Sequence, residues 1–170
     1  MKQAIMKHEA EITKDLSGKK IVVTRAFDAP LEKIWRAFTQ REILDKWWAP
    51  KPWGIETRTL DFKPGGIWHF FMFDQAGTRY WWRVDYLTID LQRAITTTGG
   101  PSDENANFTG GLPSMQRLTE FAAGPRGTVV SITIQFENES DLEKMAGSGM
   151  LEGTAAVFNN LEELLEANAV

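Results

Sequence analysis

Six β-type stretches follow one another between residues 54 and 137, and this order restricts the possible folds more than any other feature of the chain. The stretches are rich in β-branched or aromatic residues, and glycine-containing turns such as KPGG (63–66), DQAG (74–77) and GPRG (124–127) separate several of them. Strands joined by short turns pair with their chain neighbours as antiparallel strands. The order therefore predicts an antiparallel meander.

Helical patterns flank this strand-rich segment on both sides. Residues 18–30 read as a first strand, and the apolar residues that follow recur at helical spacing. The capping-box pattern TQRE (39–42) then predicts a second short helix, and SDLE (140–143) predicts a helix near the end of the chain. We predict an α+β fold in which a long C-terminal helix covers the sheet, because a curved sheet cannot cover its own inner face.

Composition excludes several classes of function. With 42% hydrophobic and 25% charged residues and a formal net charge of -4, the chain lacks the basic excess typical of nucleic-acid binding. Cysteine is absent, which excludes disulfides and thiolate sites and fits a reducing compartment. No segment approaches the roughly 20 apolar residues of a membrane span. We therefore expect a cytoplasmic monomer that binds neither nucleic acid nor membrane.

Motifs for catalysis or metal binding are missing. His8 lies in a polar leader segment, and for His69, within a strand, a hydrogen-bonded structural role is the simpler interpretation. The chain has no HExxH or GxSxG motif and no phosphate-binding loop of Walker spacing. We predict no catalytic residue, no metal site and no cofactor. An enzyme that uses His69, Tyr80, Tyr86 or a buried carboxylate stays open as an alternative.

Arg83 and Asp85 form one polar pair of interest. Two residues apart on a strand, they point to one face, and Trp82 and Val84 point to the other. Facing a cavity, the pair could orient a polar ligand group; facing solvent, it is an ion pair worth about 0–1 kcal/mol. We favour the solvent-facing orientation because the opposite face is more apolar. Apolar residues beyond Tyr86 argue the other way, which suggests a bulge that switches the faces.

Four stretches together resemble one known family. They are FDAPLEKIWRAFT (27–39), ILDKWWAPKPW (43–53), FKPGGIWHF (62–70) and DLEKMAGSGMLEGTAAVFNNLEELL (141–165). From about Lys20 to Leu165, the chain resembles the activator of heat-shock-protein-90 ATPase homologue-like family of the START-like/SRPBCC (Bet v 1-like) superfamily. The resemblance implies a helix-grip fold: a curved antiparallel sheet of about six or seven strands wraps a long C-terminal helix and leaves a cavity. It also implies two short helices after the first strand.

The resemblance also implies a domain organisation. We expect a partly ordered N-terminal extension over residues 1–19 and a single START-like domain over residues 20–168. The eukaryotic namesake carries a further N-terminal chaperone-binding domain, and residues 1–19 are too few to supply one. Most members of the family are standalone bacterial proteins without assigned chemistry.

Seven tryptophans carry much of the aromatic surface of the chain. A buried tryptophan hides about 150–250 Å², so such residues belong to a core, a pocket wall or an interface. We assign Trp35 and Trp47, on helix faces, to the core, and for the tryptophans nearer the sheet both core and pocket stay open. Wide rings on a curved sheet can leave space beside a helix with small residues. The residues that we expect to line a ligand cavity are Trp48, Trp53, Trp68, Phe70, Met72, Trp82, Val84, Tyr86, Phe108, Ile132, Ile134, Thr154 and Phe158.

The stretch GGPSDENANFTGGLPS (99–114) reads as a long loop between two strands. Loops longer than about 12 residues are usually functional or disordered. We hypothesise that it forms a mobile flap over the cavity mouth, with Phe108 as its apolar tip.

Three functions remain in order of preference. The first is binding of a small hydrophobic or aromatic ligand in an apolar cavity between the sheet and the C-terminal helix. The second is a protein-interaction domain that acts as a co-factor of the chaperone and stimulates its ATPase, as the family name suggests. The third is a cavity enzyme of the START-like type.

Overall fold

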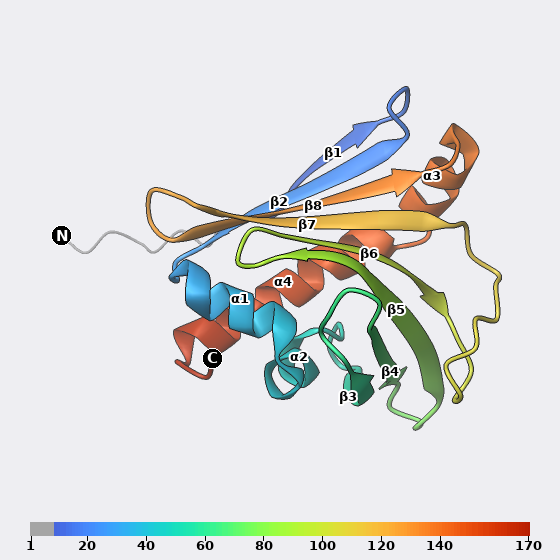
Figure 1. The fold of residues 1–170 in the computed structure, drawn as a ribbon, viewed down its shortest axis with the longest axis horizontal. Helices are drawn as coiled ribbons and strands as arrows, with labels where there is room; N and C mark the ends of the chain where they lie inside the picture. The colour runs from blue at the N-terminus through green and yellow to red at the C-terminus, as the bar shows by residue number, and fades with distance from the viewer. Residues whose placement is uncertain (1–8) are drawn as a thin grey trace.

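The computed structural model describes residues 9–170, which form one curved sheet and four helices (Figure 1). The strands are β1 (Glu11–Asp15), β2 (Lys20–Phe27), β3 (Gly54–Leu60), β4 (Ile67–Phe73), β5 (Arg79–Asp90), β6 (Ala94–Pro101), β7 (Met115–Ala123) and β8 (Thr128–Phe136). The helices are α1 (Leu31–Thr39), α2 (Arg41–Trp47), α3 (Glu139–Ala146) and α4 (Met150–Glu166).

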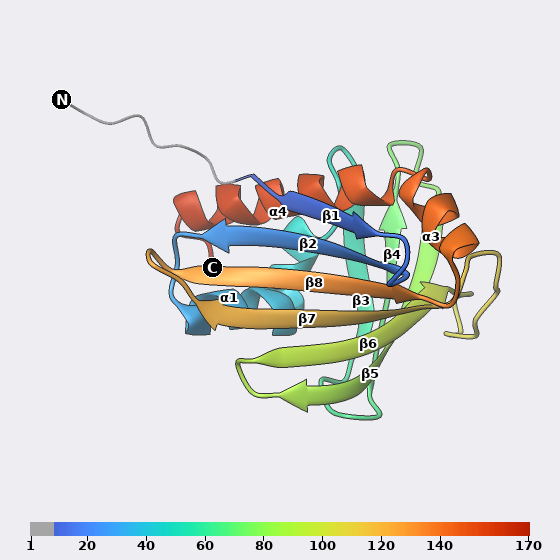
Figure 2. The same ribbon diagram turned by 90° about the horizontal axis from the view of Figure 1, so that it is seen from above.

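Every neighbouring pair in the sheet is antiparallel, in the order β1-β2-β8-β7-β6-β5-β4-β3. In Figure 1, β2 slopes upward, β7 runs almost horizontally, and β5 and β4 turn downward, so the sheet curves strongly. The longest helix, α4, runs lengthwise along the sheet (Figure 2), and its side chains contact β2. This arrangement confirms the α+β helix-grip fold. None of the helices in the described part of the chain is long and apolar enough to cross a membrane.

The sheet contains eight strands, which is more than the six or seven expected. The additional strand is β1, which pairs with β2 from Glu11 to Asp15 within the segment expected to be an extension. The Asp15 carboxylate closes the hairpin by accepting hydrogen bonds from the Ser17 hydroxyl (3.1 Å) and the Gly18 backbone N–H (3.0 Å). These bonds lower the pKa of Asp15. The domain limit at residues 19 and 20 stays a prediction.

The helix starts differ from the capping boxes that the sequence suggested. Thr39 belongs to the end of α1, and its hydroxyl donates to the Trp35 carbonyl at 2.9 Å. At the third helix the N-cap is Asn138, whose side chain accepts from the Asp141 N–H at 2.8 Å. The N-cap of α2 is Gln40, one residue after Thr39, and the N-cap of α3 is Asn138, two residues before Ser140. Neither Thr39 nor Ser140 is therefore the capping residue.

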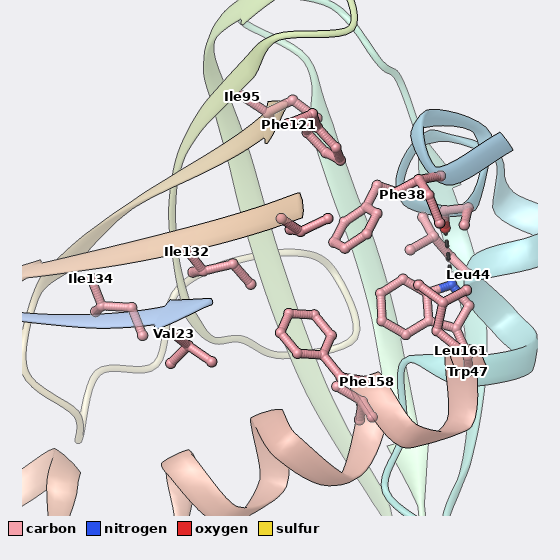
Figure 3. Close-up of a cluster of buried hydrophobic side chains, with 14 of the residues drawn as sticks. Val23, Phe38, Leu44, Trp47, Ile95, Phe121, Ile132, Ile134, Phe158 and Leu161 are labelled. Carbon is pink, nitrogen blue, oxygen red and sulfur yellow. Dashed lines mark hydrogen bonds between the residues drawn. The ribbon is translucent and has the colours of Figure 1, made fainter. Parts of the chain in front are cut away.

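The core lies between the sheet and the helices, and one part of it is packed between α4 and the strands β2 and β8 (Figure 3). The ring of Phe158, from α4, is completely buried and meets the rings of Phe27 at 5.7 Å and Phe38 at 6.5 Å edge to face. The indole of Trp47 is also completely buried, and its N–H donates to the Ala37 carbonyl at 2.9 Å. The assignment of Trp35 and Trp47 to the core is confirmed, since both are buried.

A buried ion pair joins α4 to β2. Arg25 is 1% exposed, and its guanidinium donates to Glu162 at 2.5 Å and to the Asn159 side chain at 2.9 Å. Burial lowers the pKa of Arg25, and the negative charge of Glu162 acts in the opposite direction. Because both partners lie in the packed layer, the pair fixes the position of α4 relative to the sheet.

Candidate ligand-binding site

A mostly apolar cavity of about 210 Å³ lies between the inner face of strands β4 to β7 and the helices α1 and α2. Its walls carry wide aromatic rings from both sides. The residues that line it are Phe38, Leu44, Trp48, Trp68, Phe70, Met72, Trp82, Val84, Tyr86, Ile95, Thr97, Gly99, Met115, Arg117 and Thr119.

Strand alternation and register create the sheet wall. Successive side chains of a strand point to opposite faces, so every second residue of β4 and β5 faces the cavity. Trp68 lies opposite Val84 in the register, and Phe70 lies opposite Trp82. On β6, a Cβ atom at Gly99 would lie only 3.2 Å from the Trp82 indole nitrogen. The glycine therefore allows the Trp82 ring to lie close against β6.

The helix wall comes from the end of α2 and the face of α1. The ring of Trp48 lies 5.2 Å from the ring of Trp68, so the two indoles meet edge to face across the cavity wall. The N–H of Trp68 donates to the Thr57 hydroxyl at 3.0 Å, and that hydroxyl donates to Asp45 at 2.6 Å. Since its only polar atom is already bonded, Trp68 offers the cavity an apolar surface.

Polar groups form one row across the floor of the cavity. Tyr86 on β5 is in register with Thr97 on β6, and Thr97 is in register with Arg117 on β7. Thr119 follows Arg117 on the same face of β7. Burial raises the pKa of the Tyr86 phenol, so the phenol stays neutral at physiological pH. Burial lowers the pKa of Arg117, but arginine starts from so high a pKa that its guanidinium keeps its charge in proteins.

A model of the family described as activator of Hsp90 ATPase homolog 1-like protein matches residues 28–166. The chain belongs to this family. Among solved structures, protein Ms6760 from Mycobacterium smegmatis is 24% identical, covers 91% of this chain and 95% of its own, and has a TM-score of 0.83. A protein from Arthrobacter aurescens is 24% identical, covers 92% and 91%, and has a TM-score of 0.85. These likenesses show the SRPBCC-like fold, and no curated protein matches.

Seven of the thirteen residues expected at the site line the cavity in this member of the family. Together, β4 and β5 supply six of them, because their alternation is plain in the sequence. The seven are Trp48, Trp68, Phe70, Met72, Trp82, Val84 and Tyr86. Their role in binding a ligand stays a prediction.

Four further residues expected at the cavity, from β8 and α4, are not among its lining residues. Phe158, Ile132 and Ile134 are at most 1% exposed and form part of the core (Figure 3). Thr154, on α4, is not a lining residue, and its hydroxyl donates to the Met150 carbonyl at 2.9 Å. The cavity therefore lies beside α1 and α2 and not between the sheet and α4, because the Phe158 ring fills that space.

Trp53 and Phe108 also lie away from the cavity. The Trp53 ring lies 4.9 Å from the ring of Tyr80, which is exposed. Phe108 is 51% exposed, and the Arg83 guanidinium lies 4.9 Å from the centre of its ring. Because Arg83 and Trp82 point to opposite faces of β5, Phe108 lies on the outer face of the sheet.

The stretch 99–114 is only partly a loop, since its first residues complete β6. Its remainder is bonded to the outer face and not placed over the cavity. Nε2 of His69 donates to the Asp103 carbonyl at 3.0 Å, and Arg83 donates to the Ala106 carbonyl at 2.9 Å. The structural role expected for His69 is therefore seen, and the flap over the cavity mouth is not.

Asp103 organises the tip of this loop. Its carboxylate accepts hydrogen bonds from the backbone N–H groups of Asn105 and Asn107, both at 2.9 Å. These bonds, first of all the one from Asn107, lower the pKa of Asp103. A wider, more open depression of about 500 Å³ lies beside the loop on this outer face, between Trp81 and Glu104.

The sequence analysis did not identify eight of the lining residues. Phe38 and Leu44 read as helix core, and the polar or small residues of β6 and β7 did not read as cavity wall. The alternation in MQRLTEF (115–121) was the available signal, because it puts Arg117 on the same face as the buried Met115 and Phe121. Within residues 9–170, no group of three His, Cys, Asp or Glu side chains could hold a metal ion.

The pair Arg83–Asp85 lies on the outer face, as the sequence favoured. The Arg83 guanidinium donates to the Asp85 carboxylate at 2.8 and 3.2 Å, and the side chains are 30% and 24% exposed. The bulge expected further along β5 is confirmed by a register shift between Tyr86 and Thr88.

Replacing Asp85 with asparagine is expected to lower the free energy of unfolding by no more than about 1 kcal/mol, because a partly exposed ion pair contributes little. Urea denaturation of both proteins measures the difference. A loss well above that value would mean that the pair is a buried structural element.

Proposed function

We propose that the chain binds a small hydrophobic or aromatic ligand in the cavity beside α1 and α2. The observation that carries this proposal is the lining itself: tryptophan, phenylalanine and methionine side chains surround about 210 Å³ of space. Ligand pockets in proteins are mostly apolar, with few polar groups that fix orientation. The row from Tyr86 to Arg117 has this second property.

The cavity volume limits the size of the ligand. An apolar cavity of about 150 Å³ is large enough to hold benzene. A volume of about 210 Å³ therefore suits a single aromatic ring with a short substituent, or a short alkyl chain. Sterols and long fatty acids are too large unless the walls move apart.

A cavity-filling substitution tests the proposal. Val84→Phe adds a ring inside the cavity, and we expect it to weaken binding of an apolar probe such as indole at least about tenfold, because both cannot occupy the same space. Leu118→Phe is the matched control, since strand alternation puts Leu118 on the opposite face of β7 from the lining residue Arg117. Chemical-shift titration of both variants and the wild type measures affinity and location.

Wild-type shifts at Trp48, Trp68 and Val84 on adding indole, lost in Val84→Phe and kept in Leu118→Phe, would support the proposal. Equal binding by both variants would contradict it. So would a panel of small apolar compounds that shifts no cavity resonance in the wild type.

A chaperone co-factor is the second candidate, and the family description favours it. Binding of this kind uses the surface and not the cavity. The large exposed apolar side chains include Ile12 on β1, Phe73 on β4, Leu87 on β5 and Leu91 beyond it, so they lie on several elements. Shifts confined to such surface residues on adding the chaperone, with a silent cavity, would favour this function over ligand binding.

A further inference from the structure

Arg117 is the only residue of the cavity lining that carries a charge at neutral pH. It comes from β7, where it faces inward between Met115 and Thr119, which are 9% and 7% exposed. Its guanidinium lies 5.9 Å from the centre of the Trp48 ring, on the opposite wall. A cation therefore stands among aromatic and aliphatic side chains.

No hydrogen bond or ion pair joins the Arg117 guanidinium to another residue in the described range 9–170. The lining contains neither aspartate nor glutamate. Arg25, the other inward-facing arginine of this sheet, shows the usual arrangement, since it is paired with Glu162 and Asn159. A cation in an apolar site is costly unless a counter-charge accompanies it, so Arg117 calls for an anion that the protein does not supply.

Neutral donors surround this charge. Thr97, in register with Arg117, and Tyr86, in register with Thr97, both line the cavity, as does Thr119. Residues directly opposite across antiparallel strands have Cβ atoms about 4.5–5.5 Å apart. Across the part of the chain that the structure describes, no hydrogen bond engages the hydroxyls of these three residues. They are placed to donate to the same acceptor as the guanidinium.

We infer that the ligand of the proposed cavity is a small monocarboxylate with an apolar body, its carboxylate bound by Arg117 and its body enclosed by the tryptophans. The guanidinium matches a carboxylate in two parallel hydrogen bonds. A single cation balances a single negative charge, whereas a phosphate monoester brings close to two. This inference rests on the proposed function and specifies its substrate class.

The test compares an acid with its neutral counterpart. The probes are 3-phenylpropanoate and 3-phenylpropanamide at pH 7, titrated into the full chain and followed by chemical shifts and calorimetry. We expect the wild type to bind the acid at least about tenfold more tightly, since hydrogen bonds between charged groups are stronger than neutral ones. Arg117→Met keeps an unbranched apolar stem without the charged guanidinium, and it should abolish this preference, so that acid and amide bind about equally.

Arg117→Lys is the conservative variant, and it should retain part of the preference for the acid. It keeps the positive charge but loses the planar guanidinium that can form two parallel hydrogen bonds to a carboxylate. Thr97→Val is the second variant, and it should reduce acid binding several-fold with the guanidinium in place. Chemical shifts of the wall residues Trp68 and Val84 on adding the amide show that the cavity of a variant still admits an apolar body. If Arg117→Met does not fold, the preference of the wild type for the acid and the affinity of Thr97→Val for the acid decide whether the inference holds.

Five outcomes would overturn the inference. Equal wild-type affinity for acid and amide removes the need for an anion, and an acid preference that survives in Arg117→Met places the anion elsewhere. Tighter binding of 2-phenylethyl phosphate than of the acid would assign a different anion. If the amide binds in the cavity and the acid does not, the inference fails and the proposed function stands. If neither probe shifts a cavity resonance, both fail.

Discussion

Replacing Phe158 with alanine is expected to lower the free energy of unfolding by about 3–5 kcal/mol. The Phe158 ring is completely buried between α4, Phe27 and Phe38, and it joins the helix to the sheet and to α1 (Figure 3). Its removal loses the transfer free energy of the ring and leaves a void that the packed neighbours fill only in part. Urea denaturation followed by tryptophan fluorescence measures the loss.

Val84→Ala is the control for this prediction, because Val84 lines the cavity and is only partly buried. Its truncation should cost about 1 kcal/mol, since it removes less buried surface and faces existing space. Equal losses in the two variants would mean that Phe158 and Val84 have the same surroundings, which the placement of Phe158 outside the cavity does not allow.

Replacing Glu162 with alanine is expected to cost about 3–5 kcal/mol, because it leaves the buried Arg25 guanidinium without its counter-charge. The side chains of Arg25 and Glu162 are only 1% and 14% exposed, so water replaces the carboxylate poorly. The double variant Arg25→Met/Glu162→Leu should recover most of the loss, since an apolar pair of similar size removes the unpaired charge. Thermal and urea denaturation of the three variants give the comparison.

The neighbouring residue on α4 provides a matched control. Glu163 pairs with Lys51 at the same distance, 2.5 Å, but these side chains are 52% and 68% exposed. Lys51→Ala should therefore cost no more than about 1 kcal/mol. If Glu162→Ala costs as little as Lys51→Ala, then burial does not strengthen the pairing of Arg25, and the proposed anchoring of α4 is wrong.

Much of the fold was predictable because its strands alternate clearly and its turns contain glycine and proline. The strand β1 escaped notice because Glu11, Ile12, Thr13 and Lys14 are all exposed, so no apolar face marks the strand. It exists because β2 offers a hydrogen-bonding edge and Asp15 closes the turn. Edge pairing of this kind depends on backbone groups, which leave no pattern in the sequence.

The site was predictable only on one side. Alternation in β4 and β5 identifies their inner residues, whatever fills the space in front of them. The apolar stripe of α4 looks the same whether it faces a core or a cavity, and for this reason Phe158 and Thr154 were expected at a cavity that they do not line. Arg117 was missed for the opposite reason, since a charged residue on a strand usually faces solvent.

The adjacent residues Trp47 and Trp48 show how little local sequence decides such roles. Trp47 is completely buried and bonded to Ala37, whereas Trp48, one position further, ends the helix and borders the cavity. Neighbouring residues on a helix point in directions about 100° apart. Which direction meets packed side chains and which meets space is decided by the curvature of a distant sheet.

No residue of α4 is a cavity-lining residue in the structure described above, and the helix is held instead by Phe158 and by the ion pair with Arg25. The α4 side chains that hold this helix to the sheet are thus separate from the side chains that line the cavity. Substitutions at single lining positions can therefore change the ligand specificity of the cavity without removing the contacts that hold α4 against the sheet.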